Sequence, residues 1–153
     1  MRRALLVVVV FALIAAASGG ATIVPQRGIA GIRLGMSQAK VRSVLGKPAS
    51  TKSGMNDFGA YTTLRYPGLV VTFLGNTAVT SMSTTRRSEK TASGVGVGST
   101  EAQVRARVKG VTCKTEFGSR HCYVGAFLIG HRVTDFFIKR GRVTRVNIGR
   151  VFD

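Results

Sequence analysis

The two cysteines of the chain, Cys113 and Cys122, predict a disulfide. They bracket the segment CKTEFGSRHC, in which Gly118 and Ser119 can reverse the chain and bring two strands side by side. A cross-strand disulfide that closes a loop of about ten residues would contribute roughly 2 to 3 kcal/mol to stability. A reactive thiol pair is the weaker alternative, because the CxxC spacing and the low-pKa context of redox-active cysteines are both missing.

The histidines and acids do not form a recognisable catalytic or metal centre. His121 and His131 are the only histidines, and Asp135 follows His131 by four residues. Residues four apart on an extended strand face the same way but lie about 13 Å apart, which is too far for a hydrogen-bonded pair. Two isolated histidines with scattered acids also do not supply the three or four converging ligands of a metal site. We therefore expect neither a His–Asp dyad nor a bound metal.

No other motif predicts catalysis or a cofactor. The many serines and threonines lack a GxSxG or comparable nucleophile motif. The GVGVG run at residues 94–98 lacks the Lys-Ser/Thr of a P-loop and does not complete a dinucleotide-binding fingerprint. The expected protein is not an enzyme and uses no cofactor.

The carboxy-terminal segment holds the densest positive charge. Its candidate partner-binding residues are Arg132, Lys139, Arg140, Arg142, Arg145 and Arg150. Strand alternation places Thr144 and Val146 on the core face and Arg145 on the opposite face. The planar donor fork of arginine suits phosphate or carboxylate, so these residues predict an anion-binding surface. A solvated sheet face is the alternative, and the lack of interleaved aromatic residues argues against single-stranded nucleic acid.

The amino-terminus predicts a signal peptide over residues 1–21. Arg2 and Arg3 precede an unbroken apolar run at residues 4–17, and four small residues follow it. Cleavage after Ala17 and cleavage after Ala21 both suit this pattern. An uncleaved anchor is the alternative, although about 14 apolar residues are short for a membrane span. No cysteine follows the run to take a lipid, so a lipoprotein is not expected and the mature protein should be secreted or extracytoplasmic.

The charge balance indicates what kind of partner an exported form would attract. The formal net charge of +17 falls to +15 when Arg2 and Arg3 leave with the signal peptide. A charge of this size draws polyanions at long range, which favours an anionic envelope polymer or an acidic protein. The alternative is that the basic residues are frequent because of codon composition and that the charge serves only solubility.

An internal repeat runs through the rest of the chain. Residues 31–42, GIRLGMSQAKVR, match residues 94–105, GVGVGSTEAQVR, and residues 70–82 match residues 134–146. Ser37 and Thr100 are suited to cap a helix in each repeat, and residues 46–48, Gly-Lys-Pro, should end the first helix. Apolar runs then predict strands at 61–66, 69–74 and 78–83, and at 111–117, 121–129, 133–138 and 143–148.

These elements predict an α+β fold of two tandem units, each a helix followed by an antiparallel meander, with the sheet packed on short helices. The first unit is expected at residues 31–85 and the second at residues 94–153. Residues 22–30 should be an exposed amino-terminal segment, and the polar residues 86–93 a linker.

The repeat motif also resembles known families. The pattern aliphatic-x-aliphatic-Gly-Met-Ser, followed by Val and then Leu-Gly-Lys-Pro, is similar to the repeat of β-lactamase-inhibitor proteins and to outer-membrane assembly lipoproteins of the SmpA/OmlA type. The resemblance implies a helix against an antiparallel sheet, present twice as in the inhibitor proteins. The chain lacks the lipidated cysteine of the assembly lipoproteins, and it has no Trp and few acids to match the binding face of the inhibitors.

Together these features predict a secreted, non-catalytic binding module that engages an anionic partner through a basic sheet face. The alternative is an inhibitor or assembly module with one specific protein target. A hydrolase that depends on His131 or Asp135 is the third and weakest hypothesis.

Overall fold

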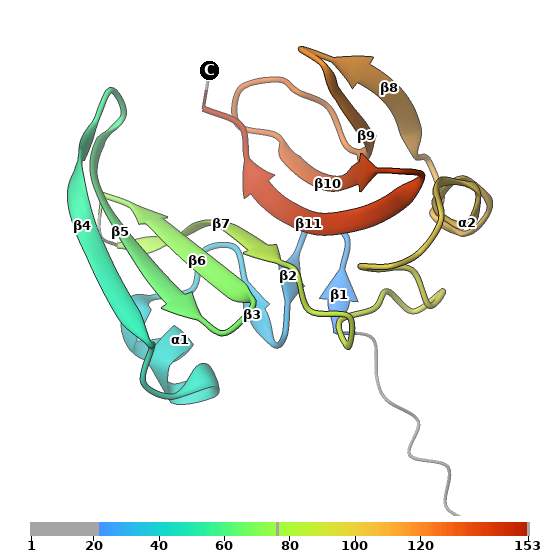
Figure 1. The fold of residues 1–153 in the computed structure, drawn as a ribbon. Coiled ribbons are helices and arrows are strands. Elements are labelled where there is room, and N and C mark those ends of the chain that lie inside the picture. The colour runs from blue at the N-terminus through green and yellow to red at the C-terminus, as the bar shows by residue number, and fades with distance from the viewer. Residues whose placement is uncertain (1–21, 76, 153) are drawn as a thin grey trace, which may run out of the picture.

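Eight antiparallel strands form one curved sheet in the computed structural model, which describes residues 22–75 and 77–152 (Figure 1). Their spatial order is β4-β5-β6-β7-β11-β10-β9-β8. The strands are β4 (Ser50–Asn56), β5 (Gly59–Tyr66), β6 (Leu69–Leu74), β7 (Ala78–Thr84), β8 (Thr112–Glu116), β9 (Ser119–Val124), β10 (Arg132–Lys139) and β11 (Arg142–Arg150). A small sheet, β1 (Ile23–Val24), β2 (Gly28–Ile29) and β3 (Ile32–Arg33), lies below the middle of the large one.

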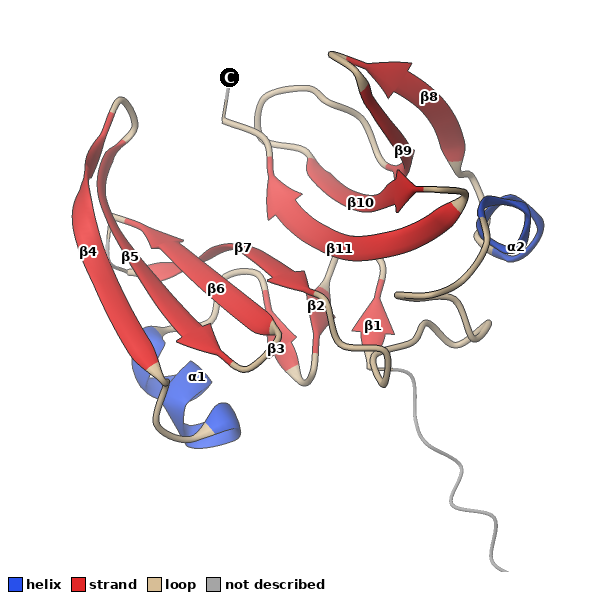
Figure 2. Ribbon diagram, in the orientation of Figure 1, coloured by secondary structure: helices blue, strands red, loops and turns tan. Residues whose placement is uncertain are grey.

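The predicted α+β class is wrong, because the protein is mostly β. Strands make up 50% of the structure and helices 12% (Figure 2). The described residues contain two short helices, α1 (Gln38–Leu45) and α2 (Glu101–Arg107), and each fully buries a single side chain, Val41 or Val104. Another apolar residue of α1, Val44, is 44% exposed. Helices of two turns bury too little surface to form a layer. The side chains of the strands therefore supply most of the core.

The two expected units do not form two helix-plus-meander layers either. Strand β7 pairs with β11, with Met82 opposite Ile148, so the strands that follow α1 and those that follow α2 continue into one sheet. The unit bounds, residues 31–85 and 94–153, stay a prediction. The predicted signal peptide at residues 1–21 lies outside the described residues. Within the described residues, none of the helices is long and apolar enough to span a membrane.

The local signals that begin and end the helices are correct. The Ser37 side chain accepts a hydrogen bond from the Lys40 backbone N–H, and Thr100 forms a reciprocal capping box with Gln103. Gly46 ends α1 with a φ of 78°, a left-handed conformation that glycine adopts at little cost.

The core lies between one face of the large sheet and the short elements that cover it. Alternate residues of β6 are fully buried: Leu69, Val71 and Phe73. The residues 22–30 are not an exposed segment as expected, because Ile23 and Ile29 are fully buried in the same core. Their alternation is too short, at two residues per strand, to be recognised in the sequence.

The expected linker, residues 86–93, is bonded to the first strand. The backbone N–H groups of Thr22 and Ile23 both donate to the Lys90 carbonyl, at 2.9 Å each. Glu89 is buried beside Arg86, at 3.6 Å. The segment is therefore fixed to the beginning of β1.

A β-bulge recurs at matching places in the two halves of the sheet. Thr80 is the extra residue of β7 opposite β6, and Thr144 is the extra residue of β11 opposite β10. Each hydroxyl donates to a carbonyl of the neighbouring strand, Thr80 to Thr72 and Thr144 to Phe137. The turn after β6 is one residue longer than the turn after β10. Phe73 pairs with Val79 next to the bulge, and the residue in the same place in the second half is Ile138, which pairs with Val143. The sequence repeat instead aligns Phe73 with Phe137.

Candidate functional site

The face of the large sheet opposite the core, here called the open face, carries most of the polar and aromatic side chains of β9 to β11. Cys122, Phe136 and Val146 are fully buried on the core face, so their chain neighbours turn to the other side. The register places His121 beside Phe137, and Phe137 beside Arg145. These three side chains form one row across the open face.

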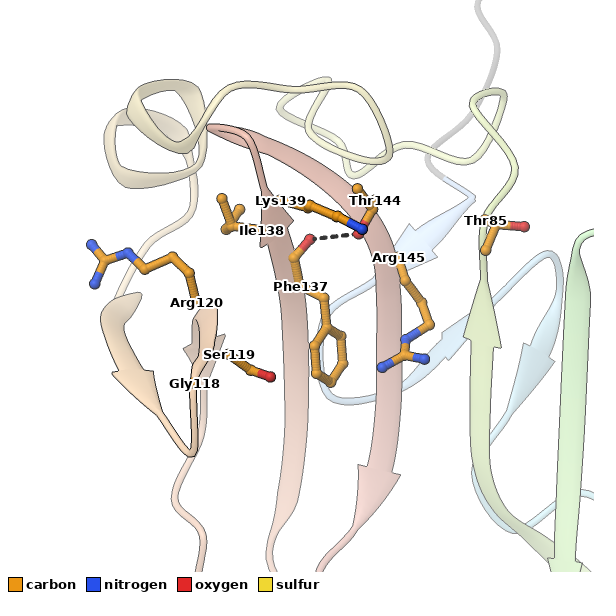
Figure 3. A pocket seen from close by; sticks show the side chains of 9 residues that line it. All are labelled: Thr85, Gly118, Ser119, Arg120, Phe137, Ile138, Lys139, Thr144 and Arg145. Atoms are coloured by element: carbon orange, nitrogen blue, oxygen red, sulfur yellow. Dashed lines mark hydrogen bonds between the residues drawn. The ribbon is translucent and has the colours of Figure 1, made fainter.

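A pocket of about 540 Å³ opens at the end of this row, where β11 extends past the end of β7 (Figure 3). Its lining residues are Thr85, Gly118, Ser119, Arg120, Phe137, Ile138, Lys139, Thr144 and Arg145. The bulge at Thr144 shapes this site, because an extra residue changes the direction of the side chains that follow. Thr144, expected on the core face, is therefore exposed, and Arg145 projects into the pocket beside Phe137 as Figure 3 shows.

Arg145 and Lys139 give the pocket its positive charge. Among the described residues, no carboxylate lies within ion-pair distance of either side chain, and the pocket lining contains no acid. The Arg145 guanidinium lies over the Phe137 ring, with its central carbon 4.0 Å from the ring centroid. This stacking holds the guanidinium while its N–H groups stay available to a ligand.

The third cation of the pocket, Arg120, is already bound. Its guanidinium turns away from the pocket in Figure 3, and its Nε donates to Glu101 at 3.0 Å. Arg105 donates to the same carboxylate at 2.9 Å. The hydrogen bond from Arg120 is the main reason that the pKa of Glu101 falls from 4.5 to about 2.

We expect Glu101→Gln to lower the free energy of unfolding by about 1 kcal/mol at pH 7, because this partly exposed carboxylate holds both arginines. A pKa that is lower in the folded state adds stability above pH 4.5, and this stability is lost as the pH falls toward 2. Urea unfolding of both proteins between pH 7 and pH 2 tests this. The difference between them should close below pH 4.5, and a constant difference would contradict the assignment.

A buried His–Asp pair lies on the open face beside the pocket. His121 Nδ1 lies 3.0 Å from both carboxylate oxygens of Asp135, and each residue is 7% exposed. The two residues are neighbours because His121 pairs with Phe137 while Tyr123 pairs with Asp135, which places them diagonally on adjacent strands. Burial raises the pKa of Asp135, and the hydrogen bond from His121 opposes that rise.

Aromatic rings enclose the imidazole of His121. The centroids of Tyr123, Phe127 and Phe137 lie 5.6, 6.2 and 6.3 Å from the His121 ring. His121 Nε2 is buried without a hydrogen bond and faces Glu116 at 3.4 Å. Glu116 is itself bound by Lys114, which lowers the pKa of the carboxyl.

The predicted site residues fall into separate groups. Cys113 and Cys122 form the expected disulfide between β8 and β9, although Phe117 and Gly118 form the turn, one residue earlier than expected. Lys139 and Arg145 line the pocket, and Arg140 lies in the turn next to them. Arg142 donates to the Gly98 carbonyl at 2.9 Å. Arg132 and Arg150 lie opposite each other in the strand register, at the far end of the same two strands.

The His121–Asp135 pair is not predicted from the sequence. His131, the histidine closer to Asp135 in the chain, is exposed, and the described residues show no hydrogen bond between the two. The connection between β9 and β10, residues 125–131, is irregular, so the register of the two strands cannot be predicted from the sequence. Which histidine lies next to Asp135 therefore cannot be predicted either.

One further cluster of ligand-type atoms does not fit a metal. Glu101 lies near the sulfur atoms of Cys113 and Cys122, all within 4.8 Å. Both sulfurs are joined in the disulfide, and thiolates rather than disulfide sulfurs bind metals. The Glu101 carboxylate is already held by two arginines.

Comparison with solved structures places the fold among small β-rich bacterial proteins, at a weak level of similarity. An extracellular protein with an SCP domain from Bacillus anthracis matches 76% of this chain, with a TM-score of 0.52 and 7% sequence identity. This chain spans only 44% of the length of that protein. The uncharacterized protein yfeY from Escherichia coli matches with a TM-score of 0.51 and 12% identity, over 86% of this chain and 99% of that one. No family model and no curated protein sequence matches the chain.

These similarities concern the fold alone, and they do not confirm the resemblance to inhibitor proteins. The disulfide is compatible with an extracytoplasmic location.

Proposed function

We propose that the protein is an extracytoplasmic, non-catalytic binding module that holds an anionic partner in the pocket beside β10 and β11. One observation carries this proposal. The pocket presents Lys139 and Arg145 without a carboxylate partner in the described part of the chain, whereas the third cation of its lining, Arg120, is already bound by Glu101. Two such cations in one hollow favour an anion there over a neutral ligand.

The pocket chemistry is best suited to phosphate or carboxylate groups. Arg145 is held in place on Phe137, so its donor fork loses little freedom when it binds two oxygens. Ser119 adds a hydroxyl at the pocket wall that can donate a further hydrogen bond. A phosphate-bearing polymer of the cell envelope provides such groups in a row, and it fits a protein of high net positive charge.

Salt-gradient elution from immobilised polyphosphate tests the proposal. The variant Lys139→Ser with Arg145→Ser is expected to lose about tenfold or more in affinity, because it removes two charge-assisted hydrogen-bond donors. The wild-type affinity should fall steeply with salt, as expected when phosphate contacts release counterions.

The matched control is Lys52→Ser with Arg65→Ser, which removes the same charge from exposed positions on β4 and β5. It should change the affinity by less than about threefold, the size expected from long-range charge alone. Equal losses in both variants would show that the pocket is only a solvated surface. Binding that is unchanged from low to high salt would also overturn the proposal.

A protein-binding role is the second candidate, and the open face supports it. Tyr123 and Phe127 contact each other edge to face there, with ring centroids 4.8 Å apart. The inhibitor proteins that the repeat motif resembles also grip their targets with aromatic residues on a sheet. This role predicts a complex with one protein that tolerates high salt, whereas pocket binding to a polyanion does not.

A hydrolase is the weakest proposal. It predicts turnover that disappears when His131 or Asp135 is replaced. Asp135 is buried and bonded to His121, so its carboxylate is not free to act on a substrate without rearrangement.

A further inference from the structure

Exposed apolar side chains gather at the end of β10 opposite the pocket. Three consecutive residues of the β9–β10 connection, Phe127, Leu128 and Ile129, are 46, 60 and 75% exposed. Phe58 in the β4–β5 turn and Phe152 after β11 are also exposed, and their rings lie 6.3 Å apart. We call these five residues the apolar ridge. Singly exposed apolar residues need no explanation, but a contiguous group marks an interaction surface.

The two parts of the ridge lie next to each other at the rim of the sheet. Backbone hydrogen bonds tie the β9–β10 connection to Val151, with the Gly130 N–H donating to the Val151 carbonyl and the Val151 N–H donating to the His131 carbonyl. Arg150 lies between the two halves, since it lines one hollow with Phe127 and another with Phe58 and Phe152. Figure 1 shows the β4–β5 turn, the β9–β10 connection and the carboxy-terminal end on the side of the sheet away from β1–β3.

Cations border the ridge. Arg132 and Arg150 are both exposed and lie opposite each other in the register of β10 and β11. The described residues of this rim include one exposed acid, Asp57 in the β4–β5 turn, while Asp135 is buried against His121. Leu128 and Ile129 are the most exposed members of the ridge, at 60 and 75%. Protruding apolar side chains with arginines at their base match the boundary between anionic lipid headgroups and acyl chains.

We propose that the apolar ridge docks the protein on an anionic lipid surface, with Leu128 and Ile129 entering the acyl region and Arg132 and Arg150 meeting the headgroups. This surface is separate from the anion pocket. Strand β10 runs from Arg132 at the ridge to Lys139 at the pocket, a distance of about 23 Å at 3.3 Å per residue. A protein docked by the ridge would keep the pocket free.

The absence of Trp from the chain allows a direct test. Ile129→Trp places a single indole on the ridge, and its fluorescence is measured with vesicles of equal parts phosphatidylglycerol and phosphatidylcholine. We expect a blue shift and quenching by brominated acyl chains. The matched control is Phe117→Trp, at the fully exposed β8–β9 turn. It should show neither change, which also distinguishes ridge insertion from attachment through the amino-terminal apolar run.

The charge contribution is tested in the same assay with Ile129→Trp in combination with Arg132→Ser and Arg150→Ser. This variant should bind the anionic vesicles about tenfold more weakly, because each arginine near an anionic surface contributes to affinity. The proposal is overturned if the indole of Ile129→Trp stays unquenched, if the indole of Phe117→Trp is quenched equally, or if pure phosphatidylcholine binds as well as the anionic mixture. Loss of polyphosphate binding by the pocket variant bears only on the proposed function.

Discussion

His121→Ala is expected to lower the free energy of unfolding by about 2 to 4 kcal/mol. The substitution leaves the Asp135 carboxylate buried, 7% exposed, without the imidazole that accounts for its hydrogen bonds at 3.0 Å. It also removes the group that opposes the rise of the Asp135 pKa, so that pKa should increase further. Urea unfolding at pH 7 measures the stability, and carboxyl NMR titration measures the pKa.

The matched control is His131→Ala, because His131 is the other histidine and is exposed. It should change the stability by no more than about 0.5 kcal/mol. A second variant, His121→Phe with Asp135→Val, removes both partners and should recover much of the loss, since no buried polar group is then left unpaired. If His121→Ala is as mild as His131→Ala, the pair does not contribute to folding.

Removal of the Cys113–Cys122 disulfide is expected to lower the free energy of unfolding by about 2 to 3 kcal/mol. The bond joins directly opposite residues of β8 and β9, and β8 is an edge strand with one neighbour in the sheet. Cys113→Ala with Cys122→Ala should therefore loosen the edge first. Hydrogen exchange of residues 112–116, measured with urea unfolding, reports both the local and the global change.

Reductant provides the control for this variant. The wild type should lose stability when dithiothreitol is added, whereas the double-alanine variant should respond to it no more than to buffer. If the wild type is insensitive to complete reduction, the bond adds nothing to the stability of the fold.

The sequence predicts the pieces of this fold better than their assembly. The caps at Ser37 and Thr100 and the helix end at Gly46 depend on neighbours in the chain, and all three are correct. Strand β4, Ser50–Asn56, is not predicted because it is an exposed edge strand without apolar alternation. The predicted fold class is wrong because the repeated helix motif is conspicuous in the sequence, although each helix buries a single residue.

The candidate site is predictable only in part, for a similar reason. Arg145 faces outward as alternation predicts, but the bulge at Thr144 and the pocket beside it depend on the partner strand. The His121–Asp135 pair depends on the register of β9 against β10, which the irregular connection between them does not reveal. The six predicted cations are near one another in the sequence, yet a strand that is about 23 Å long separates the Lys139 end from the Arg132 end.

The central position of β11 has a consequence for how the chain is made. Strand β11 follows the other strands in chain order but pairs with both β7 and β10. Until it is in place, the edges of β7 and β10 remain open templates for association with other chains. Pairings between segments so far apart in the chain also form slowly. We therefore expect the polypeptide to be most prone to association with other chains before β11 is in place.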